Sequence, residues 1–129
     1  MSVCSPAMPH VLVAEDEVLA AEAIEFFLSD IGFRVSLAGD GADALRIDEQ
    51  DPADLLLTDL AMPRVNGIVL ISQLRRRRPT LPIVVMTGCP PSGGIDVLCN
   101  GTPGRMVLVN KPFSVLRLTN ALRETLPLA

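Results

Sequence analysis

The chain has 129 residues, a length that suits one compact domain and leaves little room for a second. Nearly half of the residues are apolar, but there is no tryptophan or tyrosine and there are only four phenylalanines, so we expect an aliphatic core. The formal net charge of -4 argues against an overall attraction to nucleic acid or to an anionic membrane surface.

The beginning of the chain, residues 1–9, has two prolines and small polar residues, which predicts a flexible tail before a domain over residues 10–127. It does not have the pattern of a secretory signal, and the apolar runs of the chain are too short to span a membrane. The three cysteines show no metal-ligand spacing, and an odd number does not suit a disulfide framework. We therefore expect a cytoplasmic protein.

Five short apolar runs predict five strands. They lack the alternation of apolar and polar residues that is typical of a strand with one face in water. Runs of this kind are typical of parallel strands that are buried on both faces. The runs are Val11–Ala14, Val35–Ala38, Leu55–Leu57, Ile83–Met86 and Met106–Val109.

Helical patterns lie between these runs. The first helix has a predicted apolar stripe and ends near Gly32, a residue suited to a helix C-terminus. A short second helix over residues 42–49 has Asp40 as a plausible N-cap. The stripe of the first helix consists of Ala20, Ile24, Phe27, Leu28 and Ile31.

Two further helices complete the alternation. Leu70, Ile71 and Leu74 mark a third helix that ends before Pro79, and Ser114 is a possible cap for a last helix over residues 115–126. Repeated strand–helix units predict an α/β fold, a doubly wound parallel sheet with helices on both faces. Residues 89–104 are rich in proline and glycine, so we expect a short or irregular fourth helix there.

Polar residues follow four of the five predicted strands. Glu15 and Asp16 follow the first, Asp59 the third, Thr87 the fourth and Lys111 the fifth. In open parallel sheets, ligands bind outside the carboxyl ends of the strands. The second strand delivers no comparable group, which fits a position at the edge of the sheet.

Three carboxylates at one edge would repel each other unless a cation lay among them. A hard divalent ion such as Mg²⁺ uses one or two carboxylates and also accepts phosphate oxygens. A remaining carboxylate, Asp59, can then act as a nucleophile toward phosphorus. Lys111 and the Thr87 hydroxyl are candidate donors to the phosphoryl oxygens.

From about residue 10 to residue 126, the sequence resembles the receiver domain of two-component response regulators, the CheY-like family. The resemblance rests on the order and spacing of several short motifs. These are Glu15-Asp16, Asp40 to Leu45, Asp59-Leu60-Ala61-Met62-Pro63, Gly67, Thr87-Gly88 and Lys111-Pro112-Phe113. The resemblance implies the flavodoxin-like strand order 2-1-3-4-5.

The resemblance also implies a role for each site residue. Asp59 is then the phosphorylated residue and Asp16 a direct metal ligand, with Glu15 acting mainly through water. The backbone carbonyl of Ala61 is a further metal ligand, and Thr87 and Lys111 contact the phosphoryl group. The family also suggests a cis Lys111–Pro112 bond, the class of peptide bond to which cis geometry is largely confined.

Three features depart from the family pattern. Leu108 stands where the family often has an aromatic switch residue, and the stretch from Thr87 to Lys111 is about two residues longer than usual. Ala61 and Cys89 stand at positions that often carry polar side chains. We therefore expect that neither residue assists hydrolysis of the phosphoryl group.

His10 is the only histidine, and we expect it to precede the first strand in a structural or exposed position. Without a second histidine, the phosphoryl donor must be a separate molecule, which the family implies is a histidine kinase or a histidine phosphotransfer protein. The basic run Arg75–Arg78 is expected to be a solvated end of the third helix.

Two functions remain open from the sequence. The first is a phosphoacceptor signalling domain that assists its own phosphoryl transfer and hydrolysis, binds Mg²⁺ or another divalent cation, and acts on an unknown protein target. It is not otherwise an enzyme, and we expect neither nucleic acid nor a membrane as partner. The alternative is a receiver-like protein-binding module that works without phosphorylation, which the leucine at position 108 motivates.

Overall fold

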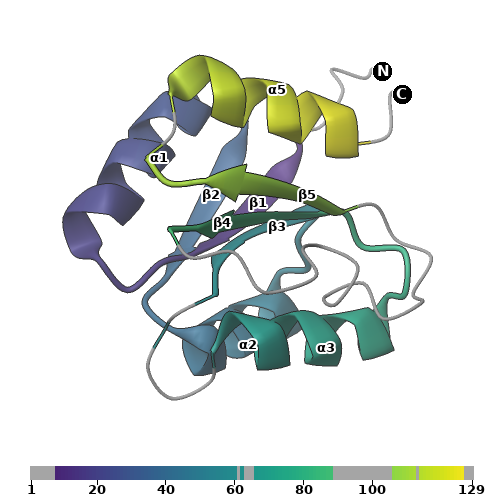
Figure 1. Ribbon diagram of the computed structural model, residues 1–129. Helices are drawn as coiled ribbons and strands as arrows, with labels where there is room; N and C mark the ends of the chain where they lie inside the picture. The colour runs from purple at the N-terminus through teal and green to yellow at the C-terminus, as the bar shows by residue number, and fades with distance from the viewer. Residues whose placement is uncertain (1–7, 61, 63–65, 89–105, 113, 127–129) are drawn as a thin grey trace, which may run out of the picture.

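A parallel five-stranded sheet with helices on both faces makes up the described part of the chain (Figure 1). The computed structural model describes residues 8–60, 62, 66–88, 106–112 and 114–126. The strands are β1 (His10–Ala14), β2 (Arg34–Ala38), β3 (Leu55–Asp59), β4 (Ile83–Thr87) and β5 (Met106–Asn110). The helices are α1 (Val18–Asp30), α2 (Gly41–Gln50), α3 (Gly67–Arg77) and α5 (Val115–Thr125).

The strand order is β2-β1-β3-β4-β5, and every neighbouring pair is parallel. The three inner strands β1, β3 and β4 are buried along their whole length, whereas β2 and β5 are partly exposed. The predicted fold class and strand order are therefore confirmed, as is the edge position of the second strand.

The two faces of the sheet are covered by different helix pairs: α1 and α5 lie on one side and α2 and α3 on the other (Figure 1). Successive residues of a strand point to opposite faces, so each inner strand contributes to two cores. In β1, Val11 and Val13 pack in the core that also holds α1 and α5, while Leu12 and Ala14 pack in the core with α3. Both cores are aliphatic in the described residues, as the composition predicts.

Helix ends follow local sequence signals. The side chains of Asp40 and Ser114 accept hydrogen bonds from Asp43 N (2.8 Å) and Arg117 N (3.1 Å), as an N-cap does. Gly32 has a φ of 105°, in the left-handed region, and its N–H donates to Ser29 O at the end of α1. The predicted N-caps Asp40 and Ser114 and the predicted helix end at Gly32 are therefore confirmed.

The predicted apolar stripe of α1 is only partly right. Ile24 and Leu28 are buried, together with Ala21, but Phe27 and Ile31 are exposed. A helix turns about 100° per residue, so Phe27 lies about 80° to one side of the direction shared by Ile24 and Leu28, at the margin of the buried side. Ile31 lies beyond the last residue of the helix.

The basic run is only in part the solvated helix end that the sequence predicts: Arg76 and Arg77 are exposed, but the other two arginines make contacts within the fold. Arg75 is buried, and its Nε donates to Leu81 O at 3.0 Å. Arg78 donates to Ala53 O and forms an ion pair with the buried carboxylate of Asp48. Arg78 therefore links the end of α3 to the end of α2 and to the loop that follows α2.

His10 is the first residue of β1 and is buried. Its Nδ1 lies 3.2 Å from Pro52 O, an atom that can only accept, so Nδ1 carries a proton. Its Nε2 lies 2.7 Å from Ser36 Oγ on β2. The sequence left open whether His10 is structural or exposed, and its burial and hydrogen bonds show that it is structural.

The predicted fourth helix falls within residues 89–104, which lie outside the described residues, as do most of the predicted N-terminal tail and Phe113. Among the helices that are described, none combines the length and the apolar character needed to cross a membrane.

Candidate functional site

The predicted site residues come together at the carboxyl ends of four strands. Asp59 and Thr87 are the last residues of β3 and β4, and Glu15 and Lys111 directly follow β1 and β5. In register, Asp59 pairs with Met86, so Thr87 lies one residue farther along the neighbouring strand. The parallel sheet therefore places at one edge side chains that are up to 96 positions apart in the sequence.

Three carboxylates form an acidic cluster there. Glu15, Asp16 and Asp59 each offer an oxygen, and these atoms all lie within 4.8 Å of one another. Glu15 and Asp59 are buried, whereas Asp16 is exposed, so the cluster opens to solvent on one side. Carboxylate oxygens in partial contact with water are the donor set that Mg²⁺ accepts, and this group of residues fits such an ion.

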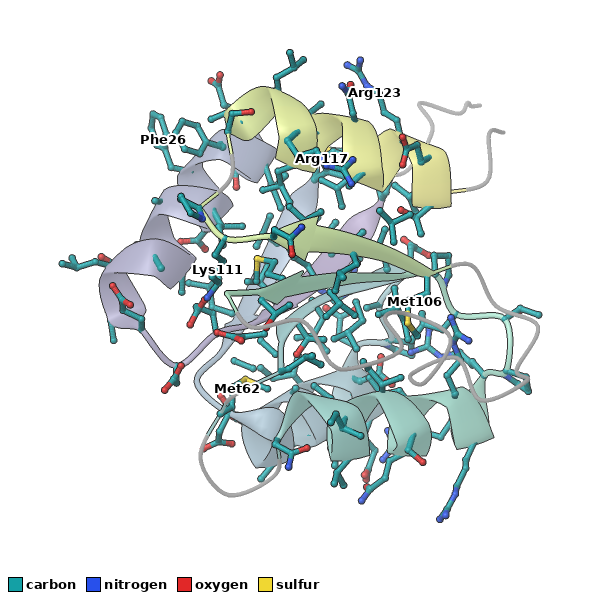
Figure 2. The ribbon with its side chains drawn as sticks, viewed as in Figure 1. Phe26, Met62, Met106, Lys111, Arg117 and Arg123 are labelled. Carbon is teal, nitrogen blue, oxygen red and sulfur yellow. The ribbon has the colours of Figure 1, made fainter. Side chains whose placement is uncertain are left out.

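Lys111 lies against two of the three carboxylates. Its Nζ donates to Asp59 Oδ2 at 2.7 Å and to Glu15 Oε1 at 2.9 Å. Figure 2 labels this side chain near the end of β5, beside the central strands. Burial lowers the pKa of Lys111, but the hydrogen bonds from its ammonium group to Asp59 and Glu15 outweigh that effect, so its pKa is raised. The side chain therefore stays charged at neutral pH.

Lys111 is the only lysine in the sequence, and the sequence has no tyrosine. Its peptide bond to Pro112 is cis, as the family resemblance suggested, and its backbone N–H donates to Thr87 O at 2.8 Å. Thr87 itself is buried at the end of β4. The backbone of Lys111 is thus tied to the strand that carries Thr87.

Two supporting contacts were not identified from the sequence. The Thr58 hydroxyl donates to Asp59 O at 2.8 Å, and the backbone N–H of Glu17 donates to Glu15 Oε2 at 3.2 Å. A threonine next to a candidate nucleophile gives no signal of this role. Only the geometry of the strand shows that its hydroxyl points toward the carbonyl of the next residue.

Gly67 begins α3 directly against the backbone of Asp59. Its N–H donates to Leu60 O at 3.0 Å. A Cβ atom at this position would lie 2.2 Å from Asp59 O and 2.7 Å from Leu60 Cα, distances that real structures do not show. The sequence marked Gly67 as part of a family motif, and the structure supplies a steric reason for glycine here.

Two predicted contributors cannot be placed. The carbonyl of Ala61 was expected to be a metal ligand, and Cys89 was expected not to assist hydrolysis of the phosphoryl group. Both residues lie outside the described residues. Leu108 is described: it is partly buried on β5 and packs against the core on the α2 and α3 side. Its carbonyl accepts a hydrogen bond from Arg117 at 3.2 Å.

Comparisons with known proteins give a family match and several relatives. The sequence matches the response regulator receiver domain family over residues 11–123. It is 33% identical over 119 residues to the probable transcriptional regulatory protein TcrX of Mycobacterium tuberculosis, covering 89% of this chain and 50% of that protein. It is 31% identical over 120 residues to the TorCAD operon regulatory protein TorR of Escherichia coli O157:H7, covering 92% of this chain and 51% of TorR. The chain thus spans about half the length of these relatives.

Solved structures show the same fold. The chemotaxis protein CheY4 of Vibrio cholerae superposes with a TM-score of 0.84 at 24% identity, covering 93% of this chain and 100% of that one. A response regulator receiver protein from Sinorhizobium medicae superposes with a TM-score of 0.78 at 27% identity, covering 92% of this chain and 94% of that one.

Proposed function

Because the chain belongs to the response regulator receiver family of two-component systems, we propose that it accepts a phosphoryl group on Asp59. The donor is the phosphohistidine of a histidine kinase or of a histidine phosphotransfer protein, and the reaction depends on Mg²⁺ or a similar divalent cation. The phosphorylated domain then acts through contacts with a target protein. The single observation that carries this proposal is the acidic cluster at one sheet edge with Lys111 in contact with Asp59.

The charges at this edge support a requirement for a cation. Three carboxylates and one ammonium group leave an excess of two negative charges, and an incoming phosphoryl group adds more. Glu15, Asp16, Asp59 and the carbonyl of Ala61 would hold the ion. When bound, it neutralises this excess and withdraws charge from the phosphoryl oxygens.

The transfer itself needs few protein groups. A carboxylate oxygen of Asp59 forms a bond to phosphorus while the bond from phosphorus to the histidine nitrogen breaks, and the leaving imidazole takes up a proton. Lys111 moves from an ion pair with the free carboxylate to one with the phosphoryl oxygens. The Thr87 hydroxyl, at the end of the next strand, donates to another of these oxygens.

A mass measurement tests the proposal. Incubation with acetyl phosphate and Mg²⁺ should add the mass of one phosphoryl group to the wild-type chain. Asp59→Asn should show no addition, whereas Asp30→Asn, which changes an exposed aspartate at the end of α1, should behave as wild type. Removing the metal with EDTA should abolish the addition and excess Mg²⁺ should restore it.

The same assay separates the alternative function, a binding module that works without phosphorylation. Leu108 favours that alternative, because it gives the fifth strand no aromatic ring to couple to Thr87. A folded wild-type chain that gains no mass from acetyl phosphate or from a phosphorylated histidine protein would refute phosphoacceptance. It would leave the binding module as the better explanation.

A further inference from the structure

α1 and α5, side by side on one face of the sheet, expose most of the large hydrophobic side chains at the described surface (Figure 1). Leu19 and Phe26 on α1 are 76% and 69% exposed, and Leu116 on α5 is 68% exposed, with Val115 beside it also exposed. Single exposed hydrophobic residues are ordinary, but a cluster on neighbouring helices is typical of an interaction surface. We call Leu19, Phe26, Val115 and Leu116 the α1–α5 patch.

α1 has two apolar sides, and the chain's own fold needs only one of them. Ile24 and Leu28 face the sheet and share a core with α5. Leu19 and Phe26 are seven residues apart, so they lie on one side of the helix, away from that core. A surface helix in a monomer normally has polar residues at such positions. The patch is therefore not explained by the packing of this chain.

The charges around the patch differ between the two helices. α1 contains no lysine or arginine and exposes Glu22 and Asp30. α5 exposes Arg117, Arg123 and Glu124, a net charge of +1, and Figure 2 labels the two arginines on this helix and Phe26 on α1. Arg117 Nη1 already lies 4.0 Å from Glu124 Oε2 on the same helix, so the charge exchange is made at Arg123. Two copies of α1 would repel each other, whereas α1 of one copy and α5 of another carry complementary charges.

We infer that the α1–α5 patch binds a second copy of this chain in a twofold-symmetric dimer. In a twofold interface a contact from α1 to α5 is repeated from α5 to α1, so both acidic helices meet basic ones. The apolar side chains fill the centre and the charged ones surround it, as in a typical interface. This inference does not depend on the proposed phosphorylation.

Sedimentation velocity over a concentration series, without a phosphodonor, tests the dimer. The wild-type chain should pass from monomer to dimer at or below about 100 μM. Phe26→Ser and Leu116→Ser should each weaken association by about tenfold or more, because truncating a central apolar anchor removes much of the binding. Ile68→Ser is the matched control, since Ile68 is an exposed apolar residue on α3, on the opposite face.

A charge exchange makes the test specific to the pairing of α1 with α5. Glu22→Arg and Arg123→Glu should each weaken self-association about tenfold or more. An equimolar mixture of the two variants should dimerise like wild type, because each contact then joins an arginine to a glutamate. Circular dichroism should show that each variant is folded.

Three results would overturn the inference. A wild-type chain that remains monomeric above about 100 μM would assign the patch to a different protein. Growth beyond a dimer would exclude the twofold arrangement. A dimer that tolerates Phe26→Ser and Leu116→Ser as well as Ile68→Ser would place the interface elsewhere.

Discussion

Replacing Gly67 with alanine is the sharpest test of how the fold positions Asp59. The new Cβ would lie 2.2 Å from Asp59 O and 2.7 Å from Leu60 Cα, and real Cβ contacts stay beyond 3.0 Å. Both neighbours are backbone atoms, so no flexible side chain can turn away. Either the end of β3 or the first turn of α3 must shift by an appreciable fraction of an ångström.

Two effects of opposite sign set the change in stability. Forcing extra volume into a packed site costs about 1–3 kcal/mol. Alanine in place of glycine within a helix returns at most about 1 kcal/mol. We therefore expect Gly67→Ala to lower the free energy of unfolding by about 1–2 kcal/mol. Because a displacement of about 1 Å at a reacting group can slow a reaction about 100-fold, phosphorylation should fall by a similar factor.

Urea unfolding and the rate of mass gain with acetyl phosphate measure the two effects. Gly39→Ala is the matched control, since a Cβ at Gly39 meets nothing within 4 Å and its backbone needs no positive φ. That variant should keep wild-type stability to within about 0.5 kcal/mol and the wild-type rate. If Gly67→Ala matched Gly39→Ala in both measurements, the steric argument for Gly67 would be wrong.

Three further predictions concern Lys111, Arg78 and Ser114. The pKa of Lys111 is raised on folding, so its contribution to stability is complete below the unfolded-state pKa of about 10.4 and is lost as pH rises through the folded-state pKa. Urea unfolding from pH 9 to about 12 should therefore show a steeper decline for wild type than for Lys111→Met, and equal slopes would refute this. Arg78→Ala removes the closest cation from buried Asp48 and should lower the free energy of unfolding by about 2–3 kcal/mol. The cost should be smaller than for a buried carboxylate left without any cation, because Arg77 Nη1 remains 3.5 Å from Asp48 Oδ2. The exposed Arg76→Ala should cost under about 0.5 kcal/mol by the same urea measurement, and similar costs for both would contradict the ion-pair argument. Ser114→Ala removes the cap of α5 and should cost about 1 kcal/mol in urea unfolding, whereas an unchanged midpoint would show that the cap is dispensable.

The strands and helix ends could be predicted because their signals are local. A run such as Val11–Ala14 predicts a buried strand in any parallel sheet, and Asp40 caps a helix with an N–H three residues away. The convergence of Glu15, Asp16, Asp59 and Lys111 also followed from the sequence, because parallel strands bring their carboxyl ends to one edge. Their chemical roles remain predictions that the mass assay tests.

The sequence by itself determined the order of strands and helices, the aliphatic core and the set of charged residues at one edge of the sheet. Only the tertiary structure decided which residues meet partners elsewhere in the fold: His10 meets Ser36, Arg78 pairs with buried Asp48, and Gly67 lies against the backbone of Asp59. It also decided that Phe27, a member of the predicted apolar stripe, is exposed. The physical reason is range, since propensity and capping act over a few residues, whereas burial and close approach depend on segments that meet only when the sheet is assembled.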